Sequence, residues 1–255
     1  MTSKVLSRWV SSGAMAVVLG LVTITVLSWL YLVGMAGDMA SMSVTDIMSL
    51  RHWTPGYFTM MLAMWVIMMV AMMTPSAAPM VLLYRQVAHK NRLADGRWGT
   101  LLFTGGYLLV WAAFSLVATL LQWWLEEAAI LSPMMVSQNH LFSGSVLVAA
   151  GIYQFSPLKQ SCLRHCRGPL LFITRYWQPG PSGALAMGVR HGTYCVGCCA
   201  ALMALLFVGG VMDLTVIAGI AVVVLLEKLF PVGEWMSKAV GVLAVILGVA
   251  LIVAH

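Results

Sequence analysis

The chain has 255 residues, of which 61% are hydrophobic and 9% are charged, and its mean hydropathy is +0.94. These values exclude a soluble globular fold and predict an all-α, polytopic bundle of membrane helices that uses residues 1–255 as a single integral membrane domain. The net charge of +6 does not require a nucleic-acid partner, because a cytoplasmic excess of Lys and Arg gives the same balance.

Apolar windows of about 19 residues predict seven transmembrane helices in succession. The first is too long for the apolar core of a signal peptide, so we expect it to remain as a span. The second is expected to continue past Pro75 and Pro79 as a kinked extension, and a tight turn at Asp213 separates the fifth from the sixth. The predicted spans are Ala14–Met35, Tyr57–Thr74, Thr100–Trp123, His140–Phe155, Thr193–Met212, Leu214–Phe230 and Ser237–Ala254.

The basic residues give an independent prediction of topology. With the N-terminus in the cytoplasm, Arg51 is the only Lys or Arg that falls outside, as the positive-inside rule favours. A seven-span chain then ends on the outer side. We therefore expect a multi-pass protein of the bacterial inner (cytoplasmic) membrane, surrounded by the lipid bilayer.

A helix inside the membrane is predicted to carry three thiols and an imidazole in the segment HGTYCVGCC. At about 100° per residue these four side chains share one helical face, and Gly192 and Gly197 leave room for a neighbouring helix. Thiolate and imidazole together match the ligand preference of Cu(I), Zn(II) and iron–sulfur clusters. The four candidate ligands are His191, Cys195, Cys198 and Cys199, of which the adjacent Cys198 and Cys199 are expected to point in diverging directions.

A second pair of thiols, Cys162 and Cys166, lies in the segment KQSCLRHCRGP, four residues apart and thus on one helical face. Arg164 and Arg167 flank the pair and are expected to place positive charge beside it, which favours the metal-binding thiolate. The two groups of thiols are predicted on the same side of the membrane. The sequence leaves open whether they form one site, two relay stations or redox pairs.

Methionine accounts for 20 of the 255 residues. Met61, Met64, Met68 and Met72 follow one another at i, i+3, i+7 and i+11, a single stripe along the second predicted span that Met60, Met69 and Met73 broaden. A thioether is a soft, neutral ligand, so the stripe is a candidate path for Cu(I) through lipid. Ordinary apolar packing explains the same pattern and remains the alternative.

Other polar residues have weaker candidate roles. Asp38 and His52 lie in a Met-rich segment predicted outside, where they form a candidate acceptor site for metal or part of an ordinary loop. Glu227 and Lys228 are expected to pair with each other or with a lipid headgroup. Tyr153, at the end of the fourth span, is a candidate partner for a ligand.

Three segments, AMMTPSAAP, YQFSPLKQSCLRHCRGP and HGTYCVGCC, together resemble the bacterial family of predicted metal-binding integral membrane proteins. The similarity extends from about Tyr57 to Lys228 and departs from the family pattern at Ala200, where a Trp is expected. The resemblance implies metal handling but specifies neither the metal nor the reaction. It places at motif positions Met72, Met73, Cys162, Cys166, His191, Cys195, Cys198 and Cys199.

These patterns favour a protein that binds a soft transition metal, with Cu(I) first and Zn(II) or another transition metal as alternatives. We expect it to move the metal across the membrane along the methionine stripe, in a direction that the sequence leaves open. One alternative is a membrane thiol–disulfide oxidoreductase, because Cys195 and Cys198 form a C-x-x-C. Another is an assembly factor that delivers metal to a periplasmic or cytoplasmic metal-handling protein. Neither an ATP-binding loop nor a hydrolase motif occurs in the sequence.

Overall fold

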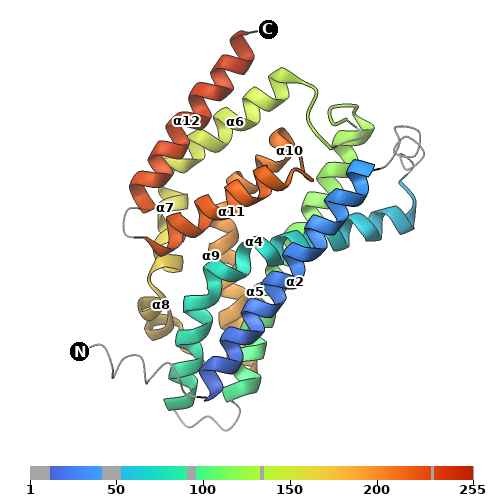
Figure 1. Ribbon diagram of the computed structural model, residues 1–255. Coiled ribbons are helices and arrows are strands. Elements are labelled where there is room, and N and C mark those ends of the chain that lie inside the picture. Colours follow the sequence, from blue (N-terminus) through green and yellow to red (C-terminus); the bar gives the residue numbers. More distant parts are fainter. Residues whose placement is uncertain (1–11, 42–52, 91–95, 133–134, 231–232, 255) are drawn as a thin grey trace.

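The structure, a computed structural model, describes residues 12–41, 53–90, 96–132, 135–230 and 233–254 (Figure 1). Within these ranges the chain is helical apart from short connections and one isolated bridge between Leu131 and Ser137, which confirms the all-α prediction. The helices are α2 (Ser12–Ser41), α4 (Pro55–Lys90), α5 (Gly96–Glu127), α6 (His140–Gln154), α7 (Pro157–Arg167), α8 (Pro169–Tyr176), α9 (Gly180–Ala204), α10 (Leu206–Gly209), α11 (Leu214–Leu229) and α12 (Gly233–Val253).

Five helical stretches among the described residues are long and apolar enough to cross a membrane. A sixth results if α6 and α7, which meet at a 63° bend, count as one span. Helix α11 is apolar but has only 16 residues. The seven spans and the orientation of the termini therefore stay a prediction.

Helices α2 and α12 present large apolar side chains at the surface. Leu27 and Leu30 of α2 are 60% and 63% exposed, and α12 exposes Leu243 and Ile246 in the same way. An apolar surface of this extent is unfavourable in water and fits the acyl chains of a bilayer. The exposed faces thus agree with insertion into a membrane.

Helix α4 runs through the centre of the bundle, with α2, α5, α8 and α11 packed against it (Figure 1). As predicted, it continues past Pro75 and Pro79. Beside the first proline, the Met73 carbonyl accepts hydrogen bonds from the hydroxyls of Ser76 and Tyr107. This irregular stretch of α4 is therefore held by side chains of the bundle interior.

Glycines allow the helices around α9 to approach closely. A Cβ at Gly106 of α5 would lie 2.5 Å from the Leu185 carbonyl oxygen of α9, and a Cβ at Gly188 of α9 would collide with the Phe103 backbone of α5. Gly192, predicted to leave room for a neighbour, faces Val110. Close backbone contact of this kind fixes α9 firmly against α5.

The connection from α9 to α11 differs in part from the expected tight turn. Helix α9 begins at Gly180, well before the predicted Thr193, and the short α10 follows it. Gly210 then adopts φ +107°. The Asp213 carboxylate caps α11 by accepting hydrogen bonds from the backbone amides of Thr215 and Val216. Asp213 therefore lies at the predicted break between the two helices and caps the second of them.

Candidate metal centre

Helices α7, α9 and α11 meet around the cysteines, with α5 and α4 behind them. Cys195, Cys198 and Cys199 of α9 are each 1% exposed, and Cys166 of α7 is half-buried. All five cysteines of the chain are free thiols in the structure. The bundle thus keeps reactive sulfur away from its outer surface.

We refer to Cys166, Cys195, Cys198 and Cys199 as the thiol cluster. The Cys198 sulfur lies 3.3 Å from that of Cys199 and 3.9 Å from that of Cys166. The Cys195 thiol is within interaction range of the other three. The structure therefore brings the two sequence motifs together, whereas the expected divergence of Cys198 and Cys199 is wrong, because their side chains turn toward the same point.

Cys162 lies at the edge of this arrangement. Its sulfur packs against Gly197, where a Cβ would lie 2.7 Å away, so the glycine is what allows α7 to approach α9. The Tyr153 hydroxyl donates to the Gly197 carbonyl oxygen at 2.5 Å and secures the same contact from α6. Cys162 and Tyr153 thus support the position of α9 beside the cluster.

A lysine provides the positive charge at the cluster. The Lys228 ammonium of α11 donates to the Cys195 sulfur at 2.9 Å and to the Ser76 hydroxyl at 3.1 Å. The expected pairing of Lys228 with Glu227 is wrong, because adjacent residues of a helix do not face each other. Arg167, which was expected beside the thiols, donates from its guanidinium to the Phe230 carbonyl oxygen.

Glu227 instead forms a buried ion pair with Lys159 of α7, at 2.8 Å and with both side chains at most 1% exposed. The Ser237 hydroxyl of α12 donates to the same carboxylate, and the Gln154 side chain of α6 accepts from Lys159. Four helices are thereby tied together directly behind Lys228. This network orients α11 so that the next residue, Lys228, points at the thiols.

Tyr107 of α5 links the cluster to α4. Its hydroxyl lies 3.2 Å from the Cys195 sulfur and donates to the Met73 carbonyl oxygen, also at 3.2 Å. The Tyr107 ring stacks on the imidazole of His191, with centroids 5.4 Å apart. His191 is buried, and among the described residues its Nδ1 has no hydrogen-bond partner.

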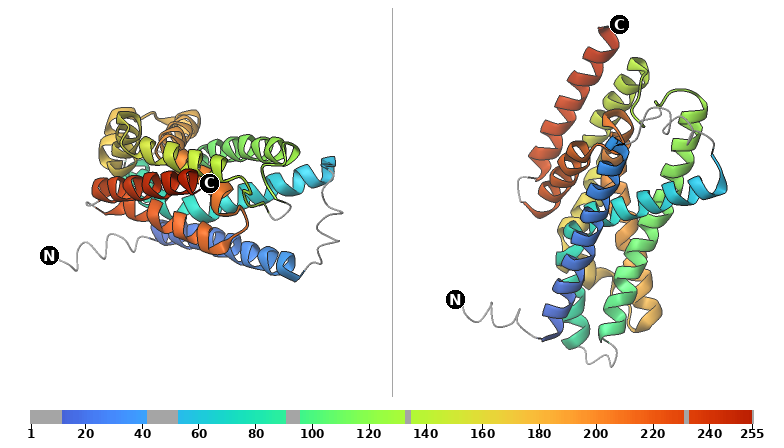
Figure 2. Two further views of the ribbon diagram at one scale, coloured as in Figure 1. Left: turned by 90° about the horizontal axis from the view of Figure 1, so that it is seen from above. Right: turned by 45° about the vertical axis from the view of Figure 1, so that its right-hand side comes forward.

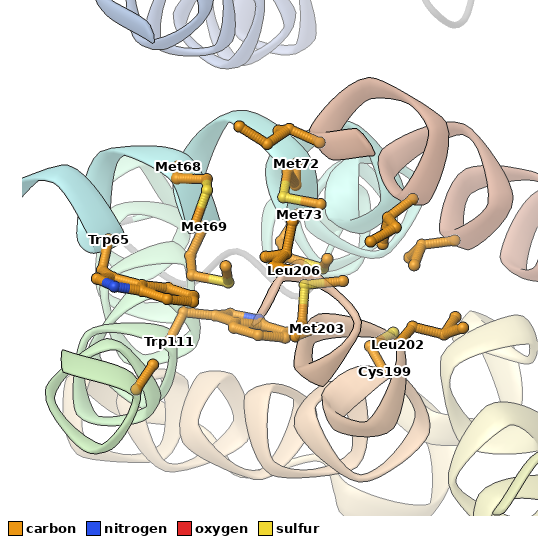
Figure 3. Packing of buried hydrophobic residues seen from close by; sticks show 14 of the residues in the cluster. Trp65, Met68, Met69, Met72, Met73, Trp111, Cys199, Leu202, Met203 and Leu206 are labelled. Carbon is orange, nitrogen blue, oxygen red and sulfur yellow. The ribbon is translucent and has the colours of Figure 1, made fainter. Parts of the chain in front are cut away.

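The methionine stripe, defined as Met61, Met64, Met68 and Met72, is at most 2% exposed along its whole length. It belongs to the same buried cluster of side chains as Cys195, Cys198 and Cys199. Figure 3 shows Met73 of α4 beside Met203 of α9, while Met68 and Met69 lie over the rings of Trp65 and Trp111. The methionines of α4 and three of the thiols therefore share one buried cluster of side chains.

The far end of the stripe meets a polar group on α5. The Gln122 amide nitrogen approaches the Met61 sulfur at 3.8 Å and donates to Glu126 at 2.8 Å. Trp65 and Trp53 donate to Gln122 and Glu126 respectively. The Met61 end of the stripe thus lies next to the Gln122 amide, which in turn contacts the Glu126 carboxylate.

The predicted outer acceptor site is not assembled in the described residues. Asp38 is exposed in the last turn of α2, where its carbonyl oxygen accepts from Ser41. His52 lies outside the described residues. The acceptor site therefore stays a prediction.

Sequence reasoning missed Lys228 and Tyr107, the two polar groups that contact the Cys195 sulfur. A signal for Lys228 was present, because an intramembrane charge is a functional candidate by default and cannot pair with its own neighbour on a helix. No comparable signal marked Tyr107, since one tyrosine in an apolar helix is common. Among the described residues, no three His, Cys, Asp or Glu side chains stand in a ready-made metal arrangement.

Comparison with known families gives a match over residues 62–251, to the family PpoB2, described as a copper chaperone. The match includes the thiol cluster, Lys228 and all of the methionine stripe except Met61. Neither curated proteins nor solved structures give a match. A copper chaperone family agrees with the predicted handling of a soft metal. Because the match covers most of its length, the chain belongs to this copper chaperone family.

Proposed function

We propose that this protein is a membrane-embedded copper chaperone of the bacterial inner membrane. It holds Cu(I) as cargo at the thiol cluster and passes it along the methionine stripe toward the outer side, where a metal-handling partner protein receives it. The single observation that carries this proposal is the convergence of four thiols from two helices at one buried point, next to a row of thioethers.

The chemistry of the cluster fits Cu(I) in particular. Thiolate and thioether are soft ligands, and a buried group composed of sulfur alone favours a soft cation over Mg²⁺ or Ca²⁺, which prefer oxygen. The unpartnered Nδ1 of His191 adds a nitrogen donor on the same face of α9. Copper remains Cu(I) throughout, so no electron acceptor is needed.

Lys228 gives the metal-free cluster its counter-charge. A thiolate without a nearby cation is unfavourable in the low-dielectric interior of a bundle, and the ammonium at 2.9 Å from Cys195 compensates it. An incoming Cu(I) carries the same unit charge as the ammonium. For Cu(I) to bind, Cys195 must therefore give up its contacts with Lys228 and Tyr107 and bind the metal instead. This requirement accounts for the lack of a ready-made metal-binding geometry among the described residues.

Transfer along α4 is a series of ligand exchanges. Each step replaces one Cu–S bond by another, and a thiolate that loses copper regains either a proton or its contact with Lys228. Met73 stands next to Tyr107, and the stripe ends at Gln122 and Glu126. A carboxylate is a poor ligand for Cu(I), so the metal is not retained there.

The proposal is tested by loading the purified protein with Cu(I) under anaerobic conditions and measuring bound copper against a competing chelator. The variant Cys195→Ser/Cys198→Ser/Cys199→Ser is expected to lose tightly bound copper, because the hydroxyl of serine is a hard, weak ligand. Cys162→Ser is the matched control, since this thiol lies outside the cluster, and it should bind copper like the wild type.

Unchanged copper stoichiometry in the triple variant would overturn the proposal. Thiol trapping in cells separates it from the oxidoreductase alternative. A chaperone keeps Cys195 and Cys198 reduced whether or not copper is supplied, whereas an oxidoreductase cycles them through a disulfide.

A further inference from the structure

A cavity of about 570 Å³ lies between α2, α4 and α5, away from the thiol cluster. Both α2 and α5 pack against α4 (Figure 2), and the cavity occupies the space between them. Its walls are apolar along most of their length, with Leu21 and Ile24 on α2 and Leu101 and Leu108 on α5. The volume falls in the range of about 300–1,000 Å³ that is typical of small-molecule sites.

Two arginines stand at one end of this apolar cavity. Arg85, from the last turns of α4, is only 8% exposed, and Arg97, from the first turn of α5, is exposed. Within the described ranges no hydrogen bond or ion pair engages either guanidinium. A buried cation without a counter-charge is costly, so the cavity calls for an anion at this end.

The ligand that fits is an amphiphile with a negative headgroup. Guanidinium groups bind phosphate through paired hydrogen bonds, and basic pockets between membrane helices on the cytoplasmic side bind anionic lipid headgroups. Both arginines lie on the side that the positive-inside rule assigns to the cytoplasm. Residues 1–11 do not complement the cavity, because Lys4 and Arg8 are themselves basic.

We propose that this cavity is a binding site for an anionic phospholipid of the surrounding bilayer, with the phosphate held by Arg85 and Arg97 and an acyl chain along the apolar walls of α2 and α5. The site is separate from copper handling and does not depend on it. Its occupant fills the space between α2 and α5 and supplies a counter-charge to Arg85, which has none among the described residues.

Native mass spectrometry of the delipidated protein in detergent tests this site with defined lipids. We expect one phosphatidylglycerol to bind at least about tenfold more tightly than phosphatidylcholine, because the choline cation of phosphatidylcholine offsets the phosphate charge that pairs with the guanidinium groups. Inorganic phosphate alone should not compete, since it cannot use the apolar walls. Arg85→Gln should weaken phosphatidylglycerol binding by about tenfold or more, whereas Arg175→Gln, an exposed arginine of α8, should leave it unchanged.

A second variant tests the cavity without altering its charge. No atom lies within 4 Å of a Cβ built at Gly105, which lines the cavity, so Gly105→Leu fills the space without a clash at its first side-chain atom. This variant should elute and unfold like the wild type but lose the bound phosphatidylglycerol. Equal affinity for both lipids, or full binding by folded Gly105→Leu protein, would overturn the proposal. Strong competition by inorganic phosphate would show an anion site only and would also overturn it.

Discussion

The thiol cluster and the methionine stripe are both rows of buried sulfur, yet they are stabilised in different ways. Around the thiols, Lys228, Tyr107 and the Lys159–Glu227 pair supply charges and directed hydrogen bonds. Along α4 the stripe has aromatic and aliphatic neighbours, and within the described part of the chain its one polar contact is that of Met61 with Gln122. A strong anionic binding site needs compensating charge, whereas a path of neutral ligands needs only close packing.

The largest expected effect concerns the charge network behind the cluster. Glu227→Gln leaves the Lys159 ammonium buried without its partner, so the free energy of unfolding should fall by about 3–5 kcal/mol. Thermal or denaturant unfolding of the detergent-solubilised protein measures this loss. The double variant Lys159→Met/Glu227→Leu should recover much of it, because an apolar pair leaves no buried charge.

If Glu227→Gln were as stable as the wild type, the ion pair would not hold α11 in place. The double variant also separates stability from copper binding. If the double variant is as stable as the wild type but binds Cu(I) more weakly, the Lys159–Glu227 network positions Lys228 in addition to stabilising the bundle.

Substitutions in the methionine stripe should have little effect on stability but should slow the transfer of copper. Met68→Leu and Met72→Leu conserve volume, so each should cost less than about 1.5 kcal/mol of unfolding free energy. Because leucine cannot bind Cu(I), transfer of copper from the loaded protein to an external acceptor should slow in both variants. Stopped-flow measurement with a coloured Cu(I) chelator as acceptor gives the rate.

Met60→Leu is the matched control, since Met60 is on the same helix but 40% exposed and outside the stripe. Its transfer rate should equal that of the wild type. Normal transfer by a Met68→Leu/Met72→Leu double variant would mean that the methionines serve apolar packing alone.

The smallest expected effect is at the cap of α11. Asp213→Ala removes the acceptor of the Thr215 and Val216 amides and should cost about 1 kcal/mol. Those amides lower the pKa of Asp213, so its contribution is complete above the ordinary carboxyl pKa and is lost as the pH falls through the lowered pKa. The stability difference between wild type and Asp213→Ala should therefore vanish in strong acid. A difference that is independent of pH would contradict this assignment.

The features that could be predicted are those set by one helix alone. The shared face of His191 and Cys195, the continuation of α4 past Pro75 and the cap at Asp213 follow from helical periodicity and local backbone chemistry. The approach of another helix at Gly197 was also predicted, because only the absence of a side chain permits it.

The features that could not be predicted depend on how separate helices are rotated against one another. The sequence places Lys228 near the inner end of its helix but does not specify that it faces Cys195 on α9. The positive-inside rule places Lys159 with the other basic residues on the cytoplasmic side, yet it is fully buried against Glu227. Tertiary packing likewise turns the Cys198 and Cys199 side chains toward each other, whereas the sequence predicts that they diverge.

X-ray absorption at the copper edge of the Cu(I)-loaded protein tests the central claim most directly. The thiol cluster predicts Cu(I) in a shell composed predominantly of sulfur, and this sulfur signal should diminish in Cys195→Ser/Cys198→Ser protein and persist in Cys162→Ser protein. A shell of nitrogen and oxygen, or an identical sulfur shell in the Cys195→Ser/Cys198→Ser protein, would contradict the assignment of the cluster as the copper site.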